Sequence, residues 1–97
     1  MPALVVARAT LKDPEKFKEY APKAVQSMQE FGGEPLFRAK ADKNLTGGGD
    51  DHQITGIFKF PSLEKVDEWY GSEAYQSLRA LRDEAADIKM ISYEMMG

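Results

Sequence analysis

The sequence predicts an α+β domain in which helices cover one face of a four-stranded antiparallel sheet. Three observations predict this class. The chain has 97 residues, which suits a single domain over residues 1–97. Apolar residues alternate in four segments and recur every three or four positions in two others. The order of these segments is β-α-β-β-α-β, which is the plan of the ferredoxin-like fold.

The two helical segments have clear starting signals. Asp13 caps the first one, and Pro14 fits its first position, where no N–H donor is needed. The apolar stripe of this helix runs to Phe31, and the two glycines that follow end it. Ser62 caps the second helix, and Ser72 caps a further turn or two after an interruption.

Four strands are expected where apolar and other residues alternate. Their expected ranges are 4–11, 34–41, 52–60 and 87–95. Residues 42–51 contain three glycines among polar neighbours, so we expect a mobile loop there. These glycines lack the lysine and the helix that follow them in a phosphate-binding loop. They are interpreted as a turn, or alternatively as a lid over a pocket.

The first strand is apolar on both of its faces. Leu4 and Val6 alternate with Val5 and Ala7, although helices are expected on only one side of the sheet. A large apolar face that no helix covers indicates an interface. A second copy of the chain, related by a two-fold axis, is the simplest cover. We therefore expect a homodimer that forms through the sheet face.

Composition excludes several classes of protein. The net charge is −3, so no overall basic field favours nucleic acid. The chain has no cysteine, which excludes a disulfide scaffold and a cysteine zinc site. It shows neither a secretion signal nor the apolar run of about 18 residues that a membrane helix needs. We expect a cytoplasmic protein without a membrane or nucleic-acid partner.

Two arginines are candidate ligand-binding residues. Arg8 and Arg38 each lie in the middle of a predicted strand among apolar neighbours. A buried arginine has to be paired or hydrated. Each therefore either forms a structural ion pair or lines a cavity and binds a carboxylate or enolate with its fork of donors. The alternation predicts that both lie on the sheet face away from the helices.

His52 is the single histidine and the candidate catalytic base, because histidine titrates near neutral pH. The alternative is a solvated residue at the start of a strand. The run Asp50-Asp51-His52 is not expected to hold a metal ion, because neighbouring side chains on an extended chain point in opposite directions. No cofactor is expected either.

The second helical region supplies three more candidates. Trp69 is expected in the core. Tyr70 and Tyr75 are candidates for a pocket wall, because a buried tyrosine hydroxyl needs a partner. Arg82 is a further candidate for ligand binding, with a surface ion pair as the alternative.

Five segments of the chain form a recognisable set, and they are Val5-Val6-Ala7-Arg8-Ala9-Thr10, Asp13-Pro14-Glu15-Lys16-Phe17-Lys18-Glu19-Tyr20, Phe31-Gly32-Gly33, Phe60-Pro61-Ser62-Leu63-Glu64 and Trp69-Tyr70-x-Ser72-x-x-Tyr75-x-x-Leu78 with Arg82 after it. Taken together, these segments resemble the domain-of-unknown-function family 1330. The resemblance spans nearly the whole chain. It implies a dimeric α/β barrel, in which two ferredoxin-like subunits face each other through their sheets. The family's last strand usually ends in a valine-rich run, whereas this chain has Met90-Ile91-Ser92-Tyr93-Glu94-Met95-Met96.

The function expected from these residues is the binding or transformation of a small organic acid in a pocket of the dimer. In a cofactor-free enzyme resembling a monooxygenase or an isomerase, Arg8 and Arg38 would hold the anion and His52 would move a proton. The alternative is a non-catalytic module that binds a ligand or only dimerises. The resemblance implies no particular activity, and the fold alone does not choose among these functions.

Overall fold

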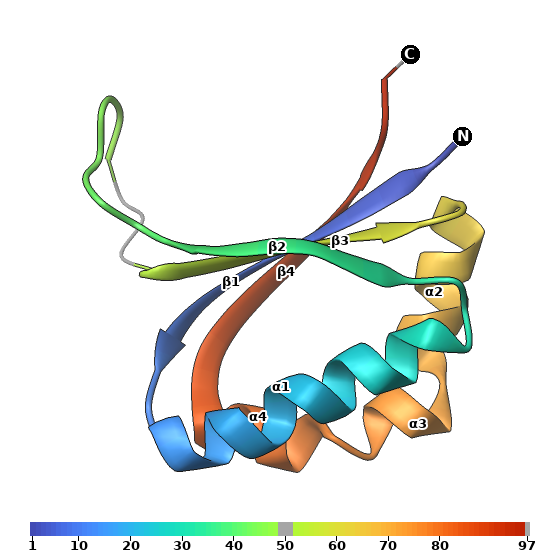
Figure 1. Ribbon diagram of the computed structural model, residues 1–97, viewed down its shortest axis with the longest axis horizontal. Coiled ribbons are helices and arrows are strands. Elements are labelled where there is room, and N and C mark those ends of the chain that lie inside the picture. Colours follow the sequence, from blue (N-terminus) through green and yellow to red (C-terminus); the bar gives the residue numbers. More distant parts are fainter. Residues whose placement is uncertain (49–51, 97) are drawn as a thin grey trace.

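The computed structural model describes residues 1–48 and 52–96. It confirms the predicted α+β class and its order of elements. These elements are β1 (Ala3–Leu11), α1 (Pro14–Gln29), β2 (Glu34–Lys40), β3 (Ile54–Phe60), α2 (Leu63–Gly71), α3 (Glu73–Gln76), α4 (Arg79–Ala85) and β4 (Ala86–Glu94). The described strands form one antiparallel sheet in the order β2-β3-β1-β4, and the helices lie on one side of it (Figure 1).

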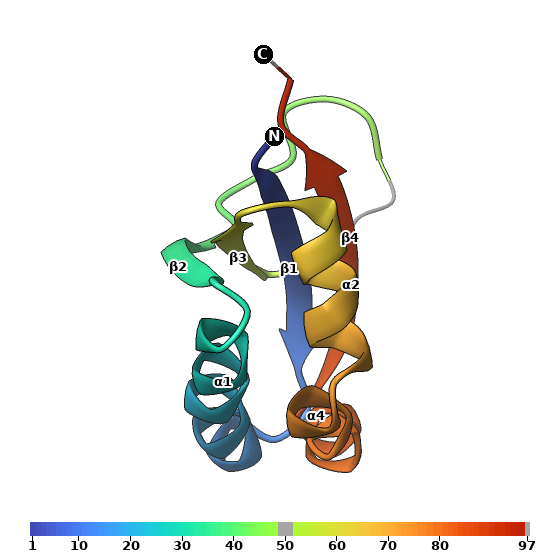
Figure 2. The ribbon, with the colours of Figure 1, turned by 90° about the vertical axis from the view of Figure 1, so that its right-hand side faces the viewer.

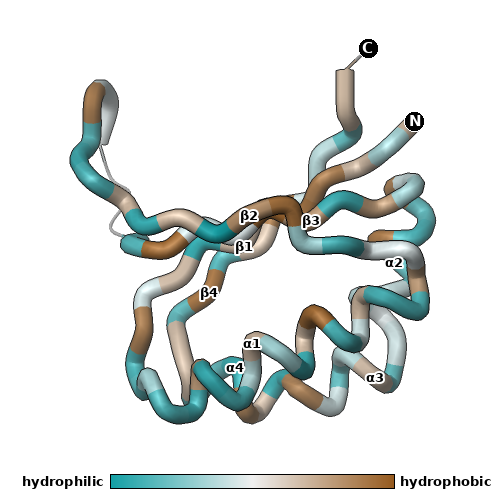
Figure 3. Tube along the Cα trace, viewed as in Figure 1, coloured by the Kyte–Doolittle hydropathy of each residue, from teal (hydrophilic) through white to brown (hydrophobic). Residues whose placement is uncertain are grey.

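The helices divide the covered face between them. Figure 2 shows α1 on the side of β2, and α2 and α4 on the side of β4. Apolar residues occur on the strands and recur along α1, whereas the segment after β2 is mostly hydrophilic (Figure 3). None of the described helices has the length and apolar character needed to cross a membrane.

The ends of α1 form as the sequence predicts. The Asp13 carboxylate accepts hydrogen bonds from the backbone N–H groups of Glu15 and Lys16, at 3.1 and 3.2 Å. After the helix, Gly32 has a φ of +78°, a left-handed conformation that glycine adopts without a steric penalty. This turn directs the chain back toward the sheet and into β2.

The second helical region is more divided than the sequence predicts. Ser62 and Ser72 cap α2 and α3 as expected, each by accepting a backbone hydrogen bond of 3.2 Å. A third piece, α4, then follows Leu78 without a side-chain cap. The breaks turn the chain so that side chains from three successive short helices meet beneath β4.

The core is centred on aromatic residues. Its largest fully buried side chains are those of Trp69, Tyr75, Phe60 and Met28. The Trp69 ring packs on Phe60 with a centroid distance of 5.4 Å, and its Nε1 donates a 3.0 Å hydrogen bond to Ser27 Oγ. Ser27 is the buried polar residue of α1, so this bond satisfies both groups and fixes α1 against α2. The expected core position of Trp69 is confirmed.

One row of paired residues crosses all four strands on the helix side. Arg38 in β2 pairs with Gly56 in β3, Gly56 pairs with Ala7 in β1, and Ala7 pairs with Met90 in β4. Paired residues share a face of the sheet. Val5, which has the same parity as Ala7 in β1, is buried in the core, so the whole row faces the helices.

Arg38 therefore lies on the opposite face from the one predicted, and a β-bulge is the reason. The pairing of β2 with β3 shifts by one residue between Pro35 and Phe37. Because side chains alternate with a period of two, one inserted residue moves every later side chain to the other face. The bulge turns Phe37 to the helix-free face and Arg38 to the helix side. A regular alternation would have done the reverse.

The helix-free face of the sheet is largely apolar at its centre. Its exposed large apolar side chains include Phe37, Ile91 and Tyr93, with exposed fractions of 56%, 37% and 47%. Arg8 lies on this face, as predicted, where its strand partners are Thr55 and Lys89.

Residues 42–48 are exposed and lack regular secondary structure. Asn44 donates a 2.8 Å hydrogen bond from its side-chain amide to the Gly47 carbonyl. Gly49, Asp50 and Asp51 lie outside the described residues. The mobility of the 42–51 loop stays a prediction.

Two strand boundaries differ slightly from the predicted ones. The third strand begins at Ile54, two residues later than predicted, and the fourth begins at Ala86, one residue earlier than predicted.

Candidate functional site

A cavity of about 380 Å³ lies between α1 and the helix side of the sheet. It exists because the row across the sheet lacks bulk at its centre. Gly56 has no side chain and Ala7 has only a methyl group, while α1 presents Ala21 and Ala24 opposite them. Larger side chains line the rest of the space, and they include Phe17, Val25, Met28, Leu36, Ile54, Phe58, Ile88 and Met90.

Two polar side chains line this otherwise apolar cavity. Arg38 stands at the edge of the sheet, and Tyr20 stands on α1. An apolar space with a few placed polar groups is the usual form of a small-molecule site. The cavity is therefore the candidate binding site of the described part of the chain.

A groove of about 1020 Å³ between α1 and β2 forms the mouth of the cavity. The groove and the cavity are continuous, because Phe17, Ala21, Val25, Arg38 and Ile54 line both spaces.

The charged residues of this groove are all basic. Lys18, Arg38 and Lys40 line it, and no carboxylate belongs to its described lining. Lys18 approaches Glu15 at 3.8 Å, but both side chains are well exposed, so this pair is weak. In a chain with a net charge of −3, such a groove is a local basic site. It favours the negatively charged end of a ligand.

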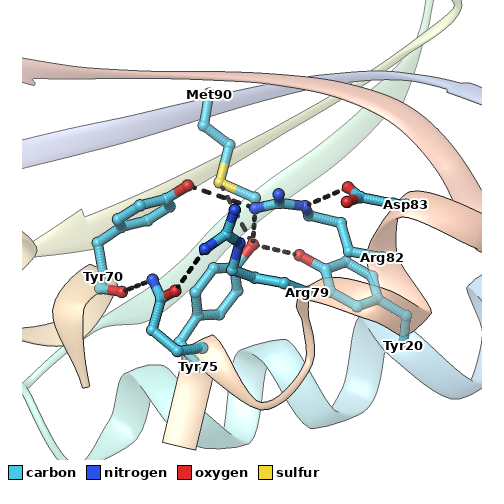
Figure 4. Close-up of polar contacts among 8 residues, drawn as sticks. Tyr20, Tyr70, Tyr75, Arg79, Arg82, Asp83 and Met90 are labelled. Carbon is cyan, nitrogen blue, oxygen red and sulfur yellow. Dashed lines mark hydrogen bonds and ion pairs between the residues drawn. The ribbon is translucent and has the colours of Figure 1, made fainter. Parts of the chain in front are cut away.

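A cluster of hydroxyl groups lies beside the inner part of the cavity. Tyr20 Oη and Tyr75 Oη are 2.8 Å apart, and Arg82 Nη1 donates to Tyr75 Oη at 3.2 Å (Figure 4). The same Arg82 nitrogen donates to Tyr70 Oη at 3.4 Å. Tyr75 Oη also contacts Met90 Sδ at 3.9 Å, which links the cluster to the wall of the cavity.

The structure thus unites Tyr70, Tyr75 and Arg82, the three candidates predicted from the second helical region. It adds Tyr20 of α1, which was not among the predicted site residues. The hydroxyl group of Tyr20 was the available signal, since a buried tyrosine needs a partner. Its partner is 55 residues away along the chain, so spacing along the sequence did not indicate it.

Burial and hydrogen bonding hold these groups in their usual protonation states. Burial raises the pKa of Tyr20 well above its ordinary value, and the neighbouring Tyr75 hydroxyl raises it further. Burial lowers the pKa of Arg82, but hydrogen bonds to Tyr75 and Tyr70 outweigh this effect, so the net pKa is raised. Near neutral pH, Tyr20 is therefore a neutral hydroxyl and Arg82 a cation. The cluster offers hydrogen-bond donors rather than a base.

The other two predicted site residues lie elsewhere. His52 Nδ1 is 3.1 Å from Thr10 Oγ1, and Thr10 belongs to the helix-free face of β1 together with Arg8. The sheet separates both residues from Arg38. The catalytic role of His52 and the ligand-binding role of Arg8 stay predictions.

The comparisons with known proteins agree with the fold. A family model described as "Domain of unknown function (DUF1330)" matches residues 2–96. The chain belongs to the DUF1330 family. No curated protein matches this DUF1330 chain.

Several solved structures are similar to the DUF1330 chain in fold. A protein of unknown function from Rhodopseudomonas palustris has a TM-score of 0.81 and 16% identity, over 99% of this chain and 83% of that one. SnoaB from Streptomyces nogalater, described as a cofactor-independent oxygenase, has a TM-score of 0.72 and 8% identity, over 99% and 94% of the two chains. A Bacteroides fragilis protein described as dimeric, with a ferredoxin-like fold, has a TM-score of 0.57 and 12% identity, over 97% and 96%.

The hydroxyl cluster predicts an asymmetry between two conservative variants. Tyr75→Phe leaves Tyr20 Oη without its partner and removes one of the two hydroxyl acceptors of Arg82 Nη1, so we expect a loss of about 1–3 kcal/mol in the free energy of unfolding. Tyr20→Phe leaves the bond between Arg82 and Tyr75 intact and is expected to cost less. Urea denaturation of both variants and of the double variant measures the difference. Equal losses that add in the double variant would contradict a shared network.

Proposed function

We propose that the protein binds a small amphipathic organic acid, with its apolar body in the cavity and its carboxylate in the basic groove. The observation that carries this proposal is the continuity of an apolar cavity with a groove whose described charged residues are all basic.

The head group of such a ligand is recognised mainly by Arg38. Within the described part of the chain, no carboxylate forms an ion pair with this guanidinium. Its planar fork of donors matches the two oxygens of a carboxylate, which favours a bidentate pair. Lys18 and Lys40 line the same groove and add positive charge to it.

The apolar body of the ligand gains free energy by leaving water. Each Å² of apolar surface that the cavity covers contributes about 25 cal/mol to the free energy of binding. Opposing costs of association reduce this gain, so a small acid with no more than a modest affinity is expected. Inorganic anions, which lack an apolar body, are expected to bind more weakly than an acid with a carbon chain.

Chemical transformation of the bound acid is the second candidate function. The donors of Tyr20, Tyr75 and Arg82 favour it, since such groups stabilise negative charge that develops on a ligand oxygen. SnoaB, with a similar fold, is described as a cofactor-independent oxygenase. Mass spectrometry of the acid after incubation with the protein in air tests this candidate. An unchanged mass supports binding without turnover.

The binding proposal predicts a charge-dependent loss in one variant. We expect octanoate to bind the wild-type protein and to bind Arg38→Met about 10- to 100-fold more weakly. This range corresponds to about 1.5–3 kcal/mol for a charge-assisted hydrogen bond. Isothermal titration calorimetry measures both affinities.

Two controls make this experiment specific. Arg79→Met removes an exposed arginine that bonds Gln76 outside the groove, and it should leave the affinity for octanoate unchanged. Octanamide, which has the same chain but no charge, should bind the wild type and Arg38→Met equally. Octanoate that binds Arg38→Met as well as it binds the wild type would contradict the proposal.

We also propose that two copies of the chain associate through their helix-free faces. The exposed apolar side chains of Phe37, Ile91 and Tyr93 support this assembly, as does the described dimer of similar fold.

Light scattering is expected to give twice the chain mass of 10.9 kDa. Ile91→Lys should give the single-chain mass, because it places a charge in the apolar interface. Leu63→Lys, on α2, is the matched control that keeps the dimer. A wild-type mass of one chain would overturn this proposal.

A further inference from the structure

The inner end of the cavity adjoins a second hollow. A space of about 390 Å³ lies between α2 and β4, and its apolar lining includes Val5, Val66 and Trp69. Met90 lines this second hollow and also lines the cavity described above. Its side chain therefore stands between the two spaces.

The row across the sheet gives the distance from the basic groove to this partition. Arg38 and Met90 are the two ends of the row, with Gly56 and Ala7 between them. They are three strand spacings apart, which is about 14 Å between their Cα atoms. An extended carbon chain held by its carboxylate at Arg38 passes over Gly56 and Ala7 and ends against Met90.

The Met90 side chain is suited to serve as a displaceable end wall. Methionine is unbranched and flexible, so it changes its rotamer at a low cost. Its paired neighbour on β1 is Ala7, which leaves room around it. The Tyr75 hydroxyl donates a hydrogen bond of 3.9 Å to the Met90 sulfur, and a bond of this kind is weak. By contrast, Trp69 beside it is fully buried and held by its bond to Ser27.

We propose that Met90 determines the length of the acid that the protein accepts. This inference rests on the proposed function, because it takes the carboxylate to be fixed at the Arg38 end. Short acids end before Met90 and do not touch it. Longer acids bind only when the thioether is displaced toward the second hollow, and this displacement limits their affinity.

The test is a series of saturated acids titrated calorimetrically into the wild type and into variants of Met90. The series is hexanoate, octanoate, decanoate, dodecanoate and tetradecanoate, each kept below its micelle concentration. For the wild type, the affinity is expected to rise with chain length and then to stop rising. Met90→Ala joins the two spaces, so the rise should continue to longer acids, with at least a tenfold gain for tetradecanoate. Met90→Phe should end the rise at a shorter acid.

Two further variants separate length selection from a general change in packing. Ile88→Ala removes a comparable apolar side chain from the same face of β4, but Ile88 lines only the first cavity. It is expected to leave the limiting chain length unchanged. Met90→Leu conserves the side-chain volume, so it should keep the wild-type limit. If Met90→Ala does not fold, Met90→Val serves in its place.

The outcomes separate this inference from the function on which it rests. If the wild type binds none of the acids, the proposed function fails. If the wild type binds them and the Met90 variants keep its limiting length, the proposed function stands and the role of Met90 is overturned. A shift of the limit with Met90→Ala but not with Ile88→Ala supports both.

Discussion

The register of one β-bulge determines where the candidate site lies. Because the pairing of β2 with β3 shifts at Leu36, Arg38 joins the same row as Gly56, Ala7 and Met90. Without that shift, the arginine would stand on the helix-free face, and Phe37 would point toward the helices. A bulky aromatic ring would then occupy the space next to Gly56. The bulge therefore supplies a cation at the mouth of the cavity and removes a large side chain from its interior.

The cavity itself follows from missing side chains. Helices packed on a sheet normally interdigitate with it to a high density. Here Gly56 and Ala7 face Ala21 and Ala24, so the two layers meet without filling the space between them. Gly56 is also restricted by its neighbours, since an added Cβ would come within 3.3 Å of the Phe58 ring.

The hydroxyl cluster connects the packing of the helices to the proposed ligand site. It joins α1 to the short helices α3 and α4, and within the described residues no buried side-chain nitrogen or oxygen lacks a hydrogen-bond partner. Tyr20 belongs to this cluster and also lines the cavity. A ligand oxygen near Tyr20 would compete with Tyr75 for its hydroxyl proton, which couples occupancy of the cavity to the packing of α1.

The sequence predicted what depends on local patterns. Capping residues such as Asp13 and Ser62 located the helix starts, and period-two alternation located the strands. The sequence did not predict the face on which Arg38 lies, because a single inserted residue decides that face. Nothing in the residues from Pro35 to Arg38 indicates a bulge. The sequence also did not predict the hydrogen bond between Tyr20 and Tyr75 or the cavity beneath Gly56. Both arise from contacts between segments that are distant in the chain.

The most direct test of the central claim is an NMR measurement of where the two ends of a bound acid lie. With octanoate bound, we predict intermolecular nuclear Overhauser effects from its terminal methyl group to the side chain of Ala7, in the interior of the cavity. Its first methylene group should show them to Arg38 and Val25. Effects to Ile57 and Ile91 on the helix-free face instead would contradict this account, because they would place the ligand on the other side of the sheet.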